Sequence, residues 1–149
     1  MPFLYQKFYN FRNIKNDTID LSHREVYFVG ENGQGKSNIL ESLYYSAYGI
    51  SFRTHVDSQL TKKGEKDFSI NSLYNKQESD TQQISIIYEN NKKLIEKKKK
   101  KIQDRKELIN TIPCIIFFFF FLRYSVGEPE CRRFFFDQSL TLYDSTYIE

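Results

Sequence analysis

The feature that most constrains the fold of this chain is a glycine-rich stretch, Gly30-Glu31-Asn32-Gly33-Gln34-Gly35-Lys36-Ser37. It matches the phosphate-loop pattern G-x-x-x-x-G-K-[ST] at every fixed position. Glycines at these places let the backbone wrap closely around phosphate oxygens, so that successive N–H groups point inward. We interpret the stretch as a nucleoside-triphosphate site, in which Lys36 reaches the terminal phosphates and the Ser37 hydroxyl binds magnesium.

The residues on both sides of this loop support the interpretation. Val26–Val29 is a short β-branched and aromatic run, which predicts a buried strand. Asn38–Tyr48 carries apolar residues at helical spacing, and Gly49 predicts the end of that helix. A helix at this place directs its positive N-terminal end toward a bound anion. The order of strand, glycine loop and helix is what a phosphate loop requires, whereas a glycine-rich turn that binds nothing does not require it.

Two further pairs of strands are predicted. Phe3–Phe11 alternates apolar and polar residues imperfectly, and Thr18–Leu21 follows it after a turn. Phe68–Tyr74 and Gln83–Tyr88 also have the composition of strands, and the polar stretch Asn75–Asp80 between them predicts a turn. The second pair therefore predicts a hairpin.

Charge is unevenly distributed along the chain. The net charge of the 149 residues is only +3, but Lys92–Lys106 holds nine basic and two acidic residues. Within this segment Lys97–Lys101 is an unbroken run of lysines. One interpretation is a solvated loop or strand end without a specific role, because like charges repel one another. The other is contact with DNA phosphates, which adds affinity that depends on salt and not on base sequence.

Cysteine and hydropathy patterns exclude several classes of protein. Cys114 and Cys131 are the only cysteines and form no C-x-x-C pair, so we expect reduced, structural thiols and not a zinc site. The longest apolar run, Ile115–Leu122, has eight residues, whereas a membrane helix needs about 20. We therefore expect a cytoplasmic protein with no membrane-spanning segment and no signal peptide.

Four segments carry a resemblance to a known family. They are Asn10–Asn13, Val29–Ser42, Gly49–Thr54 and Gly127–Leu140. Together they resemble the RecF family of bacterial DNA replication and repair proteins. The Glu-Asn-Gly-Gln-Gly-Lys loop is shared with the wider group of ABC-type, chromosome-maintenance ATPases, and the Ser-Phe-Arg-Thr sequence at Ser51–Thr54 is what narrows the choice to RecF.

The resemblance implies both a fold and a function. The expected fold is α/β, the N-terminal part of an ABC-type P-loop ATPase head, with a mixed sheet and a smaller, partly helical lobe. Residues 1–90 would form the ATPase lobe and residues 91–149 the basic segment and the start of a second lobe. The resemblance implies a factor that dimerises around ATP and binds single-stranded or gapped DNA. Such a factor works with other recombination mediators, helps to load the recombinase and supports the SOS response. Asn10 and Arg12 are implied to lie near the nucleotide.

The chain departs from the family pattern in several places. Phe118–Phe121 stands where the family typically has a polar turn. This run and Lys97–Lys101 are both homopolymers of residues with T-rich or A-rich codons, and for both we hypothesise slippage or misreading in an AT-rich gene. An apolar strand that ends in Asp and is followed by Glu, which an ATPase needs to hold magnesium and orient water, is not evident. Phe134–Asp137 imitates it but lacks the acidic neighbour. The serine- and glycine-rich signature that completes such a site across a dimer is not evident either. We therefore predict binding of ATP and Mg²⁺ without appreciable hydrolysis and assign no catalytic residue.

Two other classes of function remain open at this point. One is a different P-loop NTPase, such as a small-molecule kinase or a transporter ATPase, which would need a substrate pocket or a glutamine loop after the helix. The other is a non-catalytic fragment whose only activity is weak polyanion binding through Lys92–Lys106.

Overall fold

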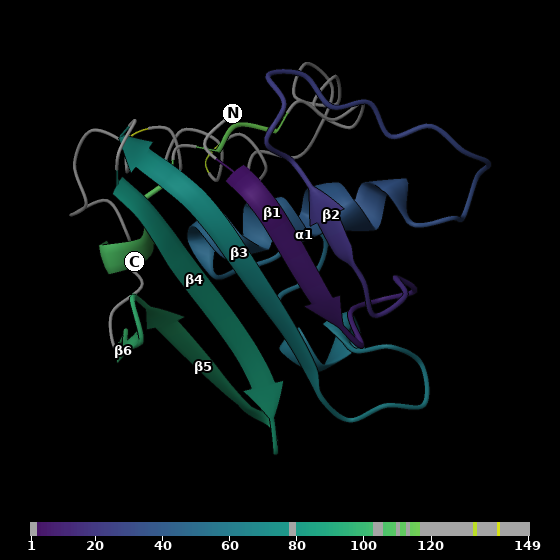
Figure 1. Ribbon diagram of the computed structural model, residues 1–149. Helices are drawn as coiled ribbons and strands as arrows, with labels where there is room; N and C mark the ends of the chain where they lie inside the picture. Colours follow the sequence, from purple (N-terminus) through teal and green to yellow (C-terminus); the bar gives the residue numbers. More distant parts are fainter. Residues whose placement is uncertain are drawn as a thin grey trace.

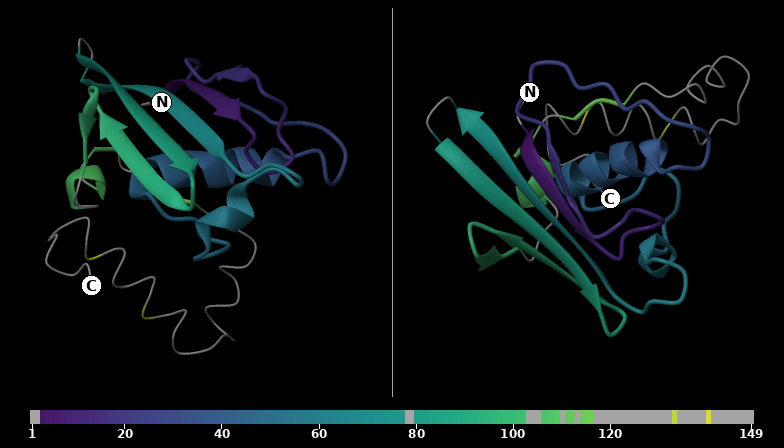
Figure 2. Two further views of the ribbon diagram at one scale, coloured as in Figure 1. Left: turned by 90° about the horizontal axis from the view of Figure 1, so that it is seen from below. Right: turned by 45° about the vertical axis from the view of Figure 1, so that its right-hand side comes forward.

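The computed structural model describes residues 3–77, 80–102, 106–109, 111, 112, 114–116, 133 and 140. The strands form one antiparallel sheet, and a long helix lies across one of its faces (Figures 1 and 2). The predictions for Phe118–Phe121, Cys131 and Phe134–Asp137 lie outside the described residues, as do those for most of Gly127–Leu140.

The sheet has six strands, and every ladder among them is antiparallel. In spatial order they are β2 (Thr18–Asp20), β1 (Phe3–Tyr9), β3 (Phe68–Gln77), β4 (Asp80–Glu89), β5 (Lys92–Lys97) and β6 (Lys100–Lys101). The structure confirms the first pair of predicted strands and the predicted hairpin, whose strands β3 and β4 extend closer to the turn than the sequence indicated.

The basic segment belongs to this same sheet. β5 pairs with β4, and β6 pairs with β5 and forms the outer edge of the sheet. Two tight turns connect these strands, Asn90-Asn91 before β5 and Lys98-Lys99 after it, and all four residues have positive φ. The division of the chain near residue 90 remains a prediction.

The helix after the glycine loop, α1 (Lys36–Tyr48), is confirmed together with its predicted end. Gly49 adopts a left-handed conformation with φ 68°, and its N–H donates to the Tyr45 carbonyl at 2.8 Å. A residue without Cβ reaches this conformation with little strain, so the helix stops there. The buried side of α1 carries Tyr44, Tyr45, Ala47 and Tyr48 and faces the sheet.

Aromatic side chains fill much of the space between α1 and the sheet. Phe68 on β3 lies at the centre of this group, with its ring centroid 5.6 Å from that of Phe11, 6.0 Å from that of Tyr45 and 5.4 Å from that of Tyr88. Ring pairs at such separations stabilise a core beyond their buried area alone. The core absorbs part of the unusual content of 14 Phe and 11 Tyr.

A small polar cluster also joins α1 to the sheet. Gln6 Nε2 donates to Ser46 Oγ at 3.1 Å, and Ser72 Oγ donates to the same oxygen at 2.8 Å. The Ser46 hydroxyl in turn donates to the Ser42 carbonyl at 2.9 Å. All four residues are buried. Because buried polar atoms are costly without partners, this cluster sets the position of α1 along β1 and β3.

One lysine of β5 fixes the segment that follows α1. The Nζ atom of Lys93 lies 2.9 Å from Asp57 Oδ2 and donates to the Gly49 carbonyl at 2.9 Å. Asp57 begins the short 3-10 helix η1 (Asp57–Leu60) and accepts a hydrogen bond from the Tyr45 hydroxyl at 2.8 Å. Burial, and then the nearby Asp57 carboxylate, raise the pKa of Tyr45, so its hydroxyl stays protonated and remains a donor.

The prediction of a strand at Val26–Val29 is wrong for this structure. The burial of the segment does alternate as in a strand, because Val26 and Phe28 pack partly against the core while Tyr27 is 79% and Val29 92% exposed. However, none of the six strands pairs with it. Strand propensity reflects a fit to a paired, half-buried surface, and without a neighbouring strand it does not produce a ladder.

Candidate nucleotide site

The glycine loop adopts a backbone that its glycines make accessible. Gly33 has φ 82° and Gly35 has φ 103°, both in the region that side chains disfavour. A Cβ atom on Gly35 would also lie 2.9 Å from Oδ1 of Asn13. Gly35 is therefore required both for its conformation and for the close approach of Asn13.

Lys36 is directed back into the loop. Its Nζ atom donates to the carbonyl of Gly30 at 2.7 Å and to that of Glu31 at 2.7 Å. The loop thus closes around an ammonium group, and one of the three Nζ donors has no partner among the described residues. A positive charge held in this way is well placed to meet an anion at the loop.

The start of α1 is open to the same anion. Its N-cap is Gly35, no side chain caps the first turn, and no acidic residue lies in that turn. The first N–H groups of a helix have no partner within it and carry a partial positive charge, which favours an anion. Ser37 lies exposed in this turn, and the remaining loop residues Gly30, Glu31, Asn32, Gly33 and Gln34 are exposed as well.

Asn13 supports the loop from the opposite side, although the sequence analysis did not single it out. Its Nδ2 atom donates to the Gly33 carbonyl at 2.6 Å, and its Oδ1 atom accepts from Asn38 Nδ2 at 2.6 Å. Asn13 thereby links the loop to the first turn of α1. The only signal in the sequence was its place in the Asn10–Asn13 segment of the family resemblance.

A buried carboxylate, Glu41 of α1, organises the next layer below the loop. Its side chain is fully buried and receives two hydrogen bonds from Arg12, from Nη2 at 2.7 Å and from Nε at 3.1 Å. The Ser51 hydroxyl donates to Glu41 Oε1 at 2.5 Å. Such a paired arrangement satisfies a charge that could not otherwise be buried. The Arg12 side chain is therefore engaged with Glu41, and its predicted place near the nucleotide, like that of Asn10, stays a prediction.

The Ser51–Thr54 segment joins the same network. Ser51 Oγ accepts a hydrogen bond from the Arg53 backbone N–H at 2.9 Å, which fixes the turn. The Arg53 Nη1 atom donates to Asn38 Oδ1 at 2.7 Å and lies 3.4 Å from Glu41 Oε2. A continuous set of hydrogen bonds thus runs from the Gly33 carbonyl through Asn13, Asn38 and Arg53 to Glu41. This gives a structural reason for the Ser-Phe-Arg-Thr sequence, which holds the loop's supporting side chains in place.

The rest of the described chain shows neither a cluster of metal-ligating side chains nor a reactive thiol. Among the described residues, no group of three or more His, Cys, Asp or Glu side chains is placed to hold a metal ion. Cys114 is a free thiol, and burial raises its pKa to about 11, so it is unreactive near neutral pH. In the described ranges, no helix is both long and apolar enough to cross a membrane.

The residues present fit a bound triphosphate with magnesium. An ammonium group, a glycine loop and an uncapped helix start converge on one place, and together they can neutralise and orient phosphate oxygens. Magnesium bound here would neutralise further phosphate charge, and the exposed Ser37 would be its protein ligand. Lys36 and the backbone donors would hold the phosphates, and Asn13 fixes the loop through its hydrogen bond to the Gly33 carbonyl.

Comparisons with known proteins agree with this geometry. The family model described as AAA domain matches residues 7–116. The DNA replication and repair protein RecF of Treponema pallidum (strain Nichols) is 51% identical over 142 residues, which cover 94% of this chain and 40% of that protein. RecF of Clostridium botulinum (strain ATCC 19397 / Type A) is 36% identical over 138 residues, which cover 93% of this chain and 38% of that protein.

Solved structures show the same relationship. The recombination mediator protein RecF-ATP of the RecFOR pathway has a TM-score of 0.86 and 26% identity to this chain, covering 98% of it and 39% of that protein. The corresponding RecF-ATPrS structure has a TM-score of 0.85. The chain spans about 40% of the length of these relatives, and the P-loop ATPase fold predicted from the sequence is confirmed. The chain therefore belongs to the AAA domain family, and both its sequence and its fold are similar to the N-terminal part of the RecF DNA replication and repair proteins.

Proposed function

We propose that the chain binds ATP at Gly30–Ser37 and contributes this site to a DNA replication and repair factor. The observation that carries the proposal is Lys36, whose ammonium group is held 2.7 Å from two loop carbonyls beside the uncapped start of α1. Lys36 would contact the terminal phosphates, and Ser37 would bind Mg²⁺. The similarity to a RecF protein described as RecF-ATP supports ATP as the nucleotide.

The wider role follows from the family. By its similarity to RecF, the protein would act in the cytoplasm, dimerise around ATP and bind single-stranded or gapped DNA together with other recombination mediators. It would help to load the recombinase and support the SOS response. The chain binds ATP without appreciable hydrolysis, because an acidic pair that orients the attacking water is not evident in its sequence. Measurable turnover of ATP that depends on Lys36 would contradict this part of the proposal.

A titration with labelled ATP and Mg²⁺ tests the site. We expect Lys36→Ala to weaken binding by about tenfold or more, because a charge-assisted contact to phosphate is lost. Lys62→Ala removes an exposed lysine outside the loop and serves as the control. Equal affinity of the wild-type and Lys36→Ala proteins would contradict the assignment of Gly30–Ser37.

A further inference from the structure

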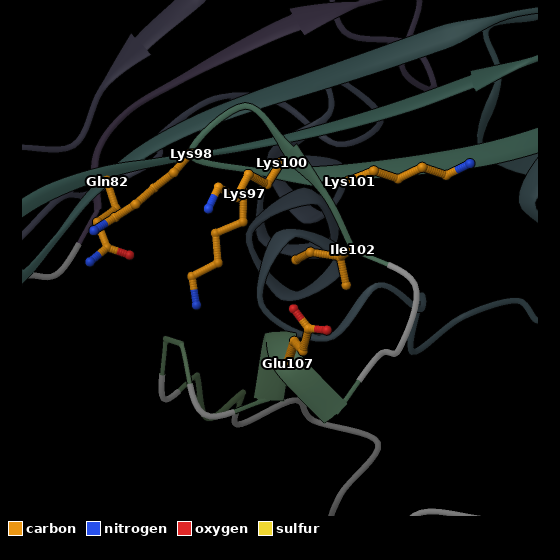
Figure 3. A pocket seen from close by; sticks show the side chains of 7 residues that line it. All are labelled: Gln82, Lys97, Lys98, Lys100, Lys101, Ile102 and Glu107. Atoms are coloured by element: carbon orange, nitrogen blue, oxygen red, sulfur yellow. The ribbon is translucent and has the colours of Figure 1, made fainter.

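A cavity lies at the edge of the sheet, next to the lysine run. It has a volume of about 380 Å³. Its lining comes from β4, the β5–β6 hairpin and α2 (Lys106–Ile109), and comprises Gln82, Lys97, Lys98, Lys100, Lys101, Ile102 and Glu107 (Figure 3). We call it the lysine cleft. β6 and the glycine loop that precedes α1 lie at opposite ends of the structure, so the cleft is separate from the nucleotide site (Figure 1).

The lining of the lysine cleft is strongly basic. Four of its described lining residues are lysines, and Glu107, directed into the cavity from α2, is the one acidic residue among them (Figure 3). Lys97 donates to Thr111 Oγ1 at 2.6 Å, and Lys98 lies 3.5 Å from Asp80 at the exposed surface. Lys100 and Lys101 form no ion pair with the described residues. The cleft therefore has more positive charge than its own side chains neutralise.

The hairpin that presents these lysines is unfavourable on local grounds. Lys98 has φ 50° and Lys99 has φ 62°, a left-handed conformation in which lysine is strained. The preceding turn of the same sheet has the same conformation but uses Asn90 and Asn91, which tolerate it. Repulsion between neighbouring ammonium groups adds to the strain. Neither effect stabilises the fold, whereas a bound polyanion would offset the charge repulsion.

We propose that the lysine cleft binds the phosphate backbone of single-stranded DNA. This proposal rests on the DNA-binding part of the proposed function and gives that function a surface. Lysine is a compact, flexible charge that attracts phosphate without reading bases, so recognition here is independent of sequence. Gln82 forms part of the wall of the cleft, where its Nε2 atom donates to Asp80 Oδ2, the carboxylate that lies beside Lys98. ATP is not required for this contact, because the nucleotide site lies elsewhere.

The first test measures binding of the full 149-residue chain to a fluorescently labelled single-stranded oligothymidine by anisotropy. We expect Lys98→Gln/Lys100→Gln to weaken binding by about tenfold at low salt. The plot of log affinity against log salt should become shallower by about 1.4, since each of the two lost phosphate contacts contributes about 0.7. The matched control is Lys62→Gln/Lys63→Gln, which removes two exposed lysines from another loop. The control should keep both the affinity and the slope of the wild type.

The second test separates binding from folding. Lys98→Asn/Lys99→Asn places in this turn the residues that the preceding turn already uses. We expect this variant to melt at the same temperature as the wild type or higher, and still to bind oligothymidine more weakly with a shallower salt dependence. If this variant binds more weakly while its melting transition is intact, loss of the hairpin cannot explain the weaker binding.

The outcomes distinguish this proposal from the one on which it rests. If the wild type does not bind oligothymidine, both the DNA-binding function and the cleft are wrong. If the wild type binds and the lysine variants bind equally well with an unchanged salt slope, only the cleft is wrong. If those variants instead self-associate while their DNA affinity is unchanged, the lysines protect the edge of β6 from pairing with other chains, and the proposal is overturned.

Discussion

At the scale of single residues, Glu41 is the buried charge around which the side chains below the glycine loop are arranged. Its carboxylate is fully buried and binds Arg12, Arg53 and Ser51, which come from two different segments of the chain. Removing one partner of a buried ion pair leaves the other charge without compensation. The structure of the loop support therefore depends on the charge of Glu41 and not only on its size.

We expect Glu41→Gln to lower the free energy of unfolding by about 3 kcal/mol, because Arg12 keeps its charge but loses its anionic partner. Arg53→Gln is the comparison, since Arg53 is 43% exposed at its side chain and its ion pair is longer, at 3.4 Å. For Arg53→Gln we expect a loss of about 1 kcal/mol or less. Urea denaturation of the two variants gives both values. A smaller loss for Glu41→Gln than for Arg53→Gln would show that the network is organised differently.

At the scale of secondary-structure elements, turn chemistry determines how well each hairpin is specified. The β4–β5 turn places Asn90 at φ 51° and Asn91 at φ 58°, and both residues are exposed. Asparagine tolerates this conformation better than most residues. The turn thus sets the register in which Glu89 faces Lys92 and Ile86 faces Ile95.

Asn90→Ala should lower the free energy of unfolding by about 1 kcal/mol, because alanine is strained at positive φ. Asn90→Gly removes the same side chain without that strain and should change stability by less than Asn90→Ala does. Thermal or urea unfolding of both variants measures the difference. Equal losses for the two substitutions would mean that the asparagine side chain, and not its backbone conformation, stabilises the turn.

At the scale of the whole molecule, the strand-like segment Val26–Val29 has no pairing partner in the described part of the chain. Tyr27 and Val29 are exposed, and the segment is not hydrogen-bonded into the sheet. An apolar, extended segment with unpaired backbone groups favours association between chains.

We expect Tyr27→Ser/Val29→Ser to reduce concentration-dependent self-association of the purified chain, as measured by sedimentation velocity. Tyr9→Ser/Val56→Ser is the control, since these two residues are also exposed apolar side chains but do not belong to this segment. The control should self-associate as the wild type does. If both double variants behave alike, exposed apolar area in general, and not this segment, causes the association.

Much of the architecture and the core of the site could be predicted from the sequence. The glycine spacing of Gly30–Ser37, the helical periodicity that ends at Gly49 and the alternation in β3 and β4 are local patterns, and local sterics produce them wherever they occur. The family resemblance was carried by specific residues in the glycine loop and in Ser51–Thr54, and not by the periodicity of the helix or strands. Local information was insufficient for Val26–Val29, because a strand depends on a neighbour that its own sequence does not specify.

Only the tertiary structure decided how distant residues come together. Asn13 and Glu41 were part of the sequence resemblance but had no assigned role, because their partners lie 10 to 29 residues away in the chain. The role of the lysine run was ambiguous in the sequence, which shows its charge but not its surroundings. The cleft forms only when the fold brings Gln82 and Glu107 beside the lysines. The sequence by itself thus determined a phosphate loop of the AAA domain family. The fold decided which side chains support that loop and where the remaining positive charge is presented, because those arrangements depend on contacts between segments far apart in the chain.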